Sequence, residues 1–179
     1  MNGHNDLKRP GHARLMSARR FGAIATLAFA ALFAIASCAT TPDDVRFAQV
    51  EQHRIAYRVL GAGQPAVVMI SGLGDGMATF NDAAAELAQS ATVIVYDRAG
   101  YGGSDAAEGA RDAHAAEREL SALLQQAGVR GPYVLLGHSV GGLYAEYYAA
   151  QHPDQIAGLI LEDARPADFR RACEAAGVS

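Results

Sequence analysis

The stretch Tyr133-Val-Leu-Leu-Gly-His-Ser-Val-Gly-Gly142 decides the fold. Its first four residues are a continuous apolar run, which is typical of a strand covered on both faces. The pentapeptide Gly137-His-Ser-Val-Gly141 follows, and a helical pattern begins directly after Ser139. Such a strand, turn and helix lift the serine above a sheet at a helix N-terminus, where backbone N–H groups can stabilise an oxyanion. The alternative is a glycine-rich turn with a structural role only.

The sequence on both sides repeats this alternation of strand and helix. Buried strands are predicted at the apolar runs 66–70, 92–96 and 158–161. Helices are predicted at about 77–89, 113–127 and 140–151. Residues 46–60 alternate apolar and polar side chains with a break near Gln52 and His53, which predicts a hairpin. Because strands that alternate with helices form parallel βαβ units, we expect an α/β fold with a mostly parallel, doubly covered sheet.

Three conspicuous loops follow the predicted strands. They are Ser71-Gly-Leu-Gly-Asp-Gly76, Asp97-Arg-Ala-Gly-Tyr-Gly-Gly-Ser104 and Gly137-His-Ser-Val-Gly141. The carboxyl ends of parallel strands meet at one edge of the sheet, which is where ligands bind in open α/β folds. The sequence therefore predicts a ligand site built from these three loops.

In combination, these loops resemble those of the α/β-hydrolase superfamily over about residues 46–165. Asp97–Ser104 resembles the superfamily's D-R-x-G-x-G-x-S loop, and Gly137–Gly141 resembles its nucleophile elbow. His152-Pro-Asp154 resembles its usual helix exit. The resemblance implies the α/β-hydrolase fold and a serine hydrolase of esterase type that needs no cofactor and acts on a small acyl or ester substrate.

The same resemblance implies the roles of individual residues. Ser139 would be the nucleophile, and the backbone N–H groups of Val140 and Leu73 would form the oxyanion hole. Many members carry His-Gly where this chain has Ser71-Gly72, but a backbone donor survives that change. Asp97 and Arg98 are expected to brace their loop.

The catalytic base is missing from this inventory. The superfamily order is serine, acid and then histidine, and His152 is the only histidine after Ser139. Thirteen residues of helix correspond to roughly 20 Å, which carries His152 to the opposite end of the sheet. His138 should point away from Ser139. Asp163 is a candidate acid because some members place it after strand six, and the alternative is a carboxylate that braces its loop.

The first 37 residues are predicted to be a signal peptide. Basic residues up to Arg20 precede sixteen apolar or small residues, fewer than the roughly 20 that a spanning helix needs. Ile35-Ala-Ser-Cys38 resembles a bacterial lipoprotein box, which implies lipidation of Cys38. Residues 38–45 would be a tether, and residues 46–179 the hydrolase domain, exported and anchored to a membrane of the bacterial cell envelope. The alternative is an uncleaved anchor helix.

Composition argues against two kinds of function, nucleic-acid binding and zinc binding. After residue 37, ten arginines face eighteen acidic residues, a net charge of −8 without a basic run, which argues against nucleic acid. The two cysteines and the histidines show no zinc spacing.

Residues 165–179 read as the start of a helix leading onward, so we expect an incomplete fold, truncated after strand six. Such a chain would be inactive or weak and could self-associate through its exposed sheet edge. Two alternatives remain open: a non-catalytic lipid-anchored binding protein, and a hydrolase of a C–C, amide or thioester bond.

Overall fold

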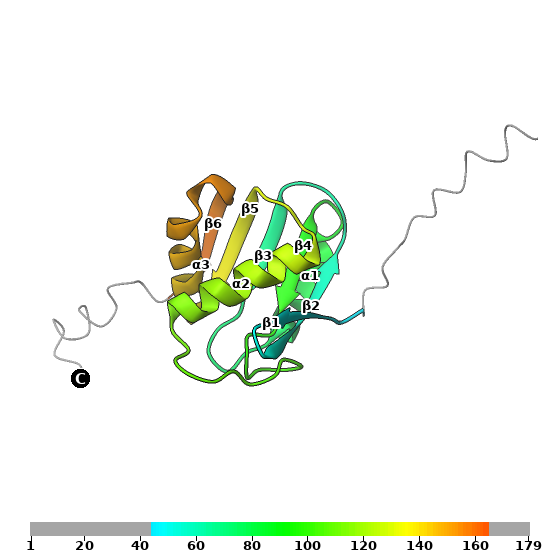
Figure 1. Cartoon of the computed structure of the whole chain (residues 1–179). Helices are drawn as coiled ribbons and strands as arrows, with labels where there is room; N and C mark the ends of the chain where they lie inside the picture. The colour runs from blue at the N-terminus through cyan, green and yellow to red at the C-terminus, as the bar shows by residue number, and fades with distance from the viewer. Residues whose placement is uncertain (1–43, 165–179) are drawn as a thin grey trace, which may run out of the picture. The chain divides into compact units, whose positions relative to one another are not determined.

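The computed structural model describes residues 44–164 (Figure 1). Its strands are β1 (Arg46–Val50), β2 (His53–Leu60), β3 (Ala66–Ile70), β4 (Thr92–Tyr96), β5 (Tyr133–His138) and β6 (Ile156–Glu162). Its α-helices are α1 (Asn81–Leu87), α2 (Ala113–Ala127) and α3 (Val140–Gln151). Two short 3₁₀ helices, η1 (Met77–Phe80) and η2 (Pro153–Gln155), complete the described elements.

The strands form a six-stranded sheet in the order β1-β2-β4-β3-β5-β6. β1 and β2 form the predicted antiparallel hairpin, and β2 also runs antiparallel to β4. The pairs β3–β4, β3–β5 and β5–β6 are parallel, as expected. Ile70 at the end of β3 pairs with Gly137 of β5, which in turn pairs with Leu161 of β6. The predicted loops therefore leave the sheet at one edge.

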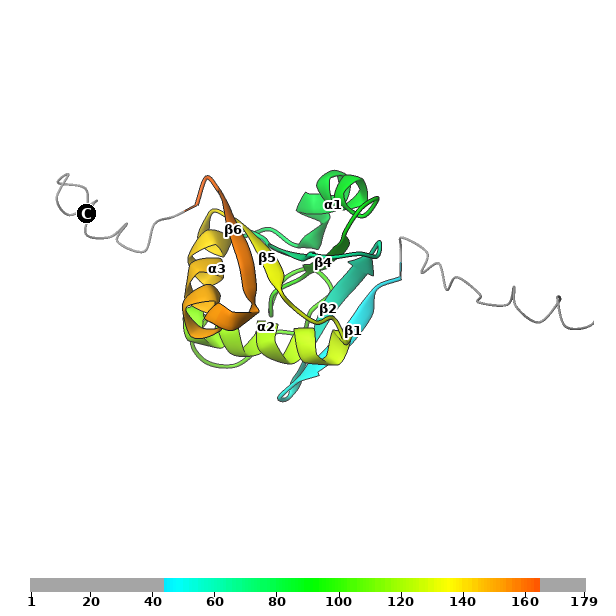
Figure 2. The same cartoon turned by 90° about the horizontal axis from the view of Figure 1, so that it is seen from above.

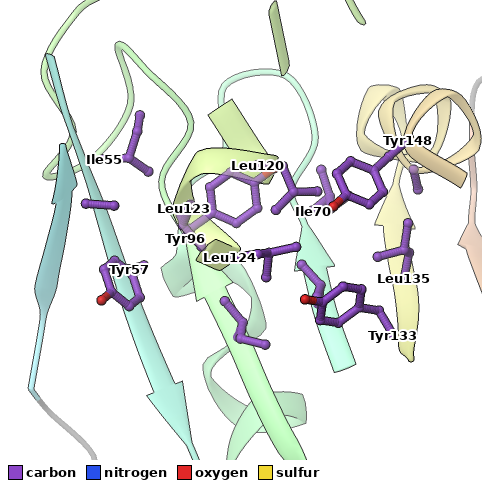
Figure 3. Close-up of a cluster of buried hydrophobic side chains, with 14 of the residues drawn as sticks. Ile55, Tyr57, Ile70, Tyr96, Leu120, Leu123, Leu124, Tyr133, Leu135 and Tyr148 are labelled. Carbon is purple, nitrogen blue, oxygen red and sulfur yellow. The ribbon is translucent and has the colours of Figure 1, made fainter. Parts of the chain in front are cut away.

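Helices cover the two faces of the sheet unequally. α2 and α3 lie on one face, and α1 lies on the other (Figure 2). Beneath α2 and α3, Tyr96 and Tyr148 pack with the leucines of α2 and with Leu135 of β5 (Figure 3). A smaller cluster joins Phe80 and Ala84 to the opposite face of β3 and β4. Burial of apolar side chains on both faces explains why the central strands are continuous apolar runs.

Local sequence sets the bounds of α2. Asp112 is its N-cap, and its Oδ1 accepts the Ala115 N–H at 2.9 Å. Gly128 ends the helix in the left-handed conformation, with φ of 69°. Leu120, Leu123 and Leu124 lie on one helical face and are buried, as their spacing predicts.

Some predicted elements differ in detail. β5 and β6 each extend beyond the predicted apolar run, and the helix predicted from residue 77 starts as 3₁₀. The double cover does not extend to β6, the strand that was expected to form an exposed edge. Within residues 44–164, its Leu159, Ile160 and Leu161 are 41%, 50% and 44% exposed, because α3 is the only described helix packed against this strand.

The predicted signal peptide at 1–37, Cys38, most of the tether and residues 165–179 lie outside the described residues. From residue 44 to residue 164, none of the helices has the length and apolar character needed to cross a membrane.

Candidate active site

Ser139 sits on the sharp turn between β5 and α3. It is the residue before the first turn of α3, and its φ of 53° and ψ of −120° are unusual for a residue with a side chain. Backbone conformations of this kind cost about 1–3 kcal/mol and gather at functional sites, where the surrounding structure enforces them. The Ser139 N–H donates to the Glu162 carbonyl at 3.0 Å, which ties the turn to the end of β6.

The two glycines of the pentapeptide are required by close backbone contacts. A Cβ atom on Gly137 would lie 2.6 Å from the Gly141 carbonyl oxygen and the Gly142 Cα. A Cβ atom on Gly141 would overlap the carbonyl oxygen of Ile70. The second contact shows that the start of α3 packs directly against the end of β3.

Gly141, the residue after Val140, thus lies against the Ser71 carbonyl at the start of the loop that carries Leu73. Val140 and Leu73 are the two residues named as oxyanion donors. Ser71 is 1% exposed, and its hydroxyl donates to the Asp75 carbonyl at 3.0 Å, which closes the loop. Leu73, within the closed turn, has a side chain that is 76% exposed. Ser71, which stands where many family members carry His, thus has a structural role in this loop. Its residue type alone did not reveal that role.

Asp97 braces two loops, as expected. Its Oδ1 accepts the Met77 N–H at 2.7 Å, and its Oδ2 accepts the Gly103 N–H at 2.8 Å. The residue is 3% exposed. Both carboxylate oxygens are therefore committed to backbone groups, which leaves Asp97 holding loops rather than facing a substrate.

Arg98 braces a different point of the same edge. Its Nη2 donates to the Gly72 carbonyl, and Gly72 precedes Leu73. The contact fixes the peptide group that carries the Leu73 N–H. The guanidinium also lies over the ring of Tyr101, with Cζ 4.6 Å from the ring centroid.

None of the histidines at residues 44–164 hydrogen-bonds to Ser139. His53 lies 3.3 Å from a Glu119 oxygen, and His152 lies 2.7 Å from a Glu117 oxygen. His152 follows the last residue of α3, at the end opposite Ser139, as predicted. His114 is exposed on the first turn of α2.

His138 contacts the loop after β3, with its Nδ1 3.7 Å from an Asp75 oxygen. Asp163, the candidate acid, is exposed and follows β6 with φ of 43°. Since β6 pairs with β5 as far as His138, Asp163 leaves the sheet at the same edge as Ser139. Within the described range, no group of three or more His, Cys, Asp or Glu side chains could hold a metal ion.

Fold and site together define an α/β protein with a serine on a strained strand–helix turn. The sequence model of the family described as "alpha/beta hydrolase fold" matches residues 65–177. The chain belongs to this α/β-hydrolase family.

Relatives and solved structures extend this result. The chain is 36% identical over 123 residues to an uncharacterised protein of Mycobacterium tuberculosis, covering 69% of this chain and 36% of that protein. It is 32% identical over 119 residues to the putative carbamate hydrolase RutD of Azorhizobium caulinodans, covering 65% and 44%. The esterase EaEST of Exiguobacterium antarcticum superposes with a TM-score of 0.61 at 30% identity, covering 66% of this chain and 44% of the esterase. The chain thus spans less than half the length of each.

Proposed function

We propose that the chain carries the nucleophile and oxyanion hole of a serine hydrolase that acts on carboxylic esters. The observation that supports it best is the strained backbone of Ser139 between β5 and α3, held by Gly137 and Gly141. The similarity to an esterase at 30% identity supports the same class of substrate.

The proposed chemistry uses the loops as they stand. Ser139 Oγ attacks the carbonyl carbon of the ester while an imidazole base takes its proton. The charge that develops on the carbonyl oxygen is stabilised by the N–H groups of Val140 and Leu73. The alkoxide leaves with the proton from the imidazole, and water then hydrolyses the acyl–serine ester by the same route. Asp163 is the candidate to orient the base.

We expect the base to come from outside the described histidines. His53 and His152 are engaged by glutamates, and His138 contacts Asp75. His114 is exposed on the first turn of α2 and makes no hydrogen bond to Ser139. A serine without a base is a weak nucleophile. The 179-residue chain alone is therefore expected to hydrolyse p-nitrophenyl butyrate barely above background and to resist fluorophosphonate labelling.

The test compares this chain with the same chain extended by a C-terminal segment that supplies an Asp and a His. The extended protein should gain esterase activity and fluorophosphonate labelling, and Ser139→Ala should remove both. Ser121→Ala is the matched control, because Ser121 lies on α2 and hydrogen-bonds to Glu117. Rapid Ser139-dependent turnover by the 179-residue chain would show that one of its own histidines is the base.

Two other functions each have one supporting observation. The similarity to a putative carbamate hydrolase favours cleavage of an amide-like bond, which a p-nitroanilide substrate would reveal. The lack of a histidine bonded to Ser139 within residues 44–164 favours a binding protein that uses the same loops without catalysis. An extended chain that binds esters but shows no Ser139-dependent labelling would support this second function.

For cell location, we propose export and anchoring to a membrane through a lipid on Cys38. The support is the basic and apolar leader followed by Ile35-Ala-Ser-Cys38.

A further inference from the structure

We propose that a cavity beside the loop that carries Leu73 binds a carboxylate of the substrate through Arg98. The cavity has a volume of 100 Å³, and Leu73, Arg98, Tyr101, Arg111, Asp112 and Tyr144 contribute to its wall. This inference rests on the proposed ester hydrolysis and names the substrate class: monoanionic esters that carry a carboxylate near the scissile bond.

Arg98 is a buried cation without a counter-charge. Arg98 is only 5% exposed, and within residues 44–164 no carboxylate lies at ion-pair distance from it. Its Nη2 donates to the Gly72 carbonyl, but its Nε–H has no hydrogen-bond acceptor. A buried charge is costly unless it is paired, so this guanidinium is an unusual feature that an anion would complete.

Two tyrosine rings hold the guanidinium. Its Cζ lies 4.6 Å from the Tyr101 ring centroid and 5.4 Å from the Tyr144 ring centroid. Aromatic faces attract a cation but supply no hydrogen-bond acceptor to the edge of the guanidinium plane. A carboxylate can therefore accept from the guanidinium N–H groups that the Gly72 carbonyl does not engage.

Arg111 and Asp112 add two further charged groups to the cavity wall. The Arg111 Nη2 donates to Glu119 at 2.7 Å, and this hydrogen bond raises the pKa of Arg111. The Asp112 carboxylate accepts the Ala115 N–H and caps α2. Arg111 is therefore paired, whereas Arg98 is not. Asp112 is exposed, so solvent screens its negative charge more than it screens the positive charge of the buried Arg98.

The position of the cavity connects it to the proposed chemistry. Leu73 forms part of its wall, and Arg98 holds the carbonyl of the preceding residue. A volume of 100 Å³ equals about three water molecules at roughly 30 Å³ each, enough for a carboxylate with one or two methylene groups. Half-esters of short dicarboxylic acids meet this description.

The test measures binding and does not require catalysis. Propionate and its neutral analogue propionamide are titrated into the 179-residue chain while the ¹⁵N–¹H signals of the Arg98 Nε–H and the Leu73 amide are followed. Propionate should give saturable shifts of both signals, and propionamide should give none. Arg98→Lys keeps the charge but loses the fork and should weaken propionate binding about tenfold.

Two variants guard against indirect effects. Ala116 also lines the cavity, and Ala116→Leu keeps Arg98 but should fill the cavity and abolish the shifts. Arg118→Gln removes a positive charge from a 48% exposed side chain on α2 and should leave binding unchanged. Equal shifts with propionate and propionamide, or an Arg98 signal that does not move, would overturn the proposal. Ser139→Ala should still bind propionate, so a failure of the hydrolase proposal and a failure of this one are distinguishable.

Discussion

Gly141 lies against the carbonyl oxygen of Ile70 so closely that a Cβ atom on Gly141 would overlap it. The contact joins the first turn of α3 to the end of β3. Gly141→Ala should therefore lower the free energy of unfolding by about 1–3 kcal/mol or prevent folding. Gly158→Ala in β6 is the control, because nothing lies within 4 Å of the added Cβ. Urea denaturation followed by circular dichroism compares the two, and equal midpoints would contradict the predicted close packing.

Asp97 offers a second test of the loops. Both of its carboxylate oxygens accept backbone N–H groups, from Met77 and from Gly103. Asp97→Asn places an amide NH₂ group against one of these donors, which should cost about 1–3 kcal/mol of stability. Asp82→Asn on the exposed surface of α1 removes the same charge and should have little effect. The urea midpoints of the two variants give the comparison, and a stable Asp97→Asn variant would show that the loops hold without this carboxylate.

Glu117 should make part of the stability depend on pH. Burial raises its pKa, but the hydrogen bonds from His152 and Ser121 outweigh this, and the pKa of Glu117 lies below its ordinary value of 4.5. A lowered pKa in the folded state contributes stability that is present above about pH 4.5 and is lost as the pH falls through the lowered value. Glu117→Gln should therefore destabilise the chain at pH 7.

That destabilisation should shrink as the pH falls through the lowered pKa of Glu117, because the wild-type carboxylate then also takes up a proton. Thermal melts of wild type and variant across pH 3–7 measure it. Glu86→Gln, on an exposed carboxylate of α1, serves as control. A difference that stays constant with pH would mean that the Glu117 charge does not stabilise the fold.

Lipidation of Cys38 can be measured directly. In a bacterial host, labelled palmitate should enter the full chain, and Cys38→Ser should abolish the label because the thiol is the acceptor. Cys173→Ser removes the other cysteine of the chain and should leave labelling intact. Label that persists in Cys38→Ser would refute the lipoprotein interpretation.

The edge strand β6 is expected to promote self-association. Leu159, Ile160 and Leu161 are each at least 41% exposed on a strand whose outer side has no described partner within residues 44–164. Exposed apolar edges of this kind pair with other chains. The 179-residue chain should form dimers or larger species in light scattering, and Ile160→Lys should shift it toward the monomer. A monodisperse monomer of the unaltered chain would contradict the expectation.

The sequence predicted most of the sheet because its signals are local. Continuous apolar runs such as 66–70 and 92–96 gave strand bounds that match β3 and β4, and Gly128 marked the end of α2. An exposed edge at β6 was expected, but the sequence could not show how far Leu159, Ile160 and Leu161 are exposed, because an apolar run shows that a strand can be buried but not what covers it. The sequence also predicted that Ser139 lies on a turn between a strand and a helix. It could not predict the contact between Gly141 and Ile70, because that contact depends on how α3 packs against β3.

The hydrogen-bond partners of the buried polar side chains could not be predicted from the sequence either. The bracing role of Asp97 was expected, but its two partners were not. The Met77 N–H is twenty residues from Asp97 in the sequence, and the Gly103 N–H is six residues from it. The closure of the loop by the Ser71 hydroxyl and the unpaired state of Arg98 depend on folded distances. Residue type alone gives no signal for either.

Asp97 and Arg98, two neighbours in the chain, together tie the loop after β3 to the loop after β4. The conformational entropy of these loops is therefore lost when the protein folds rather than when a ligand arrives. A ligand that docks against Leu73 and Val140 would meet groups already in place, so little of its binding energy would be spent on ordering them. The same connection means that a change in the length of one loop would disturb the other, so new specificity is expected to arise from segments that these two residues do not hold.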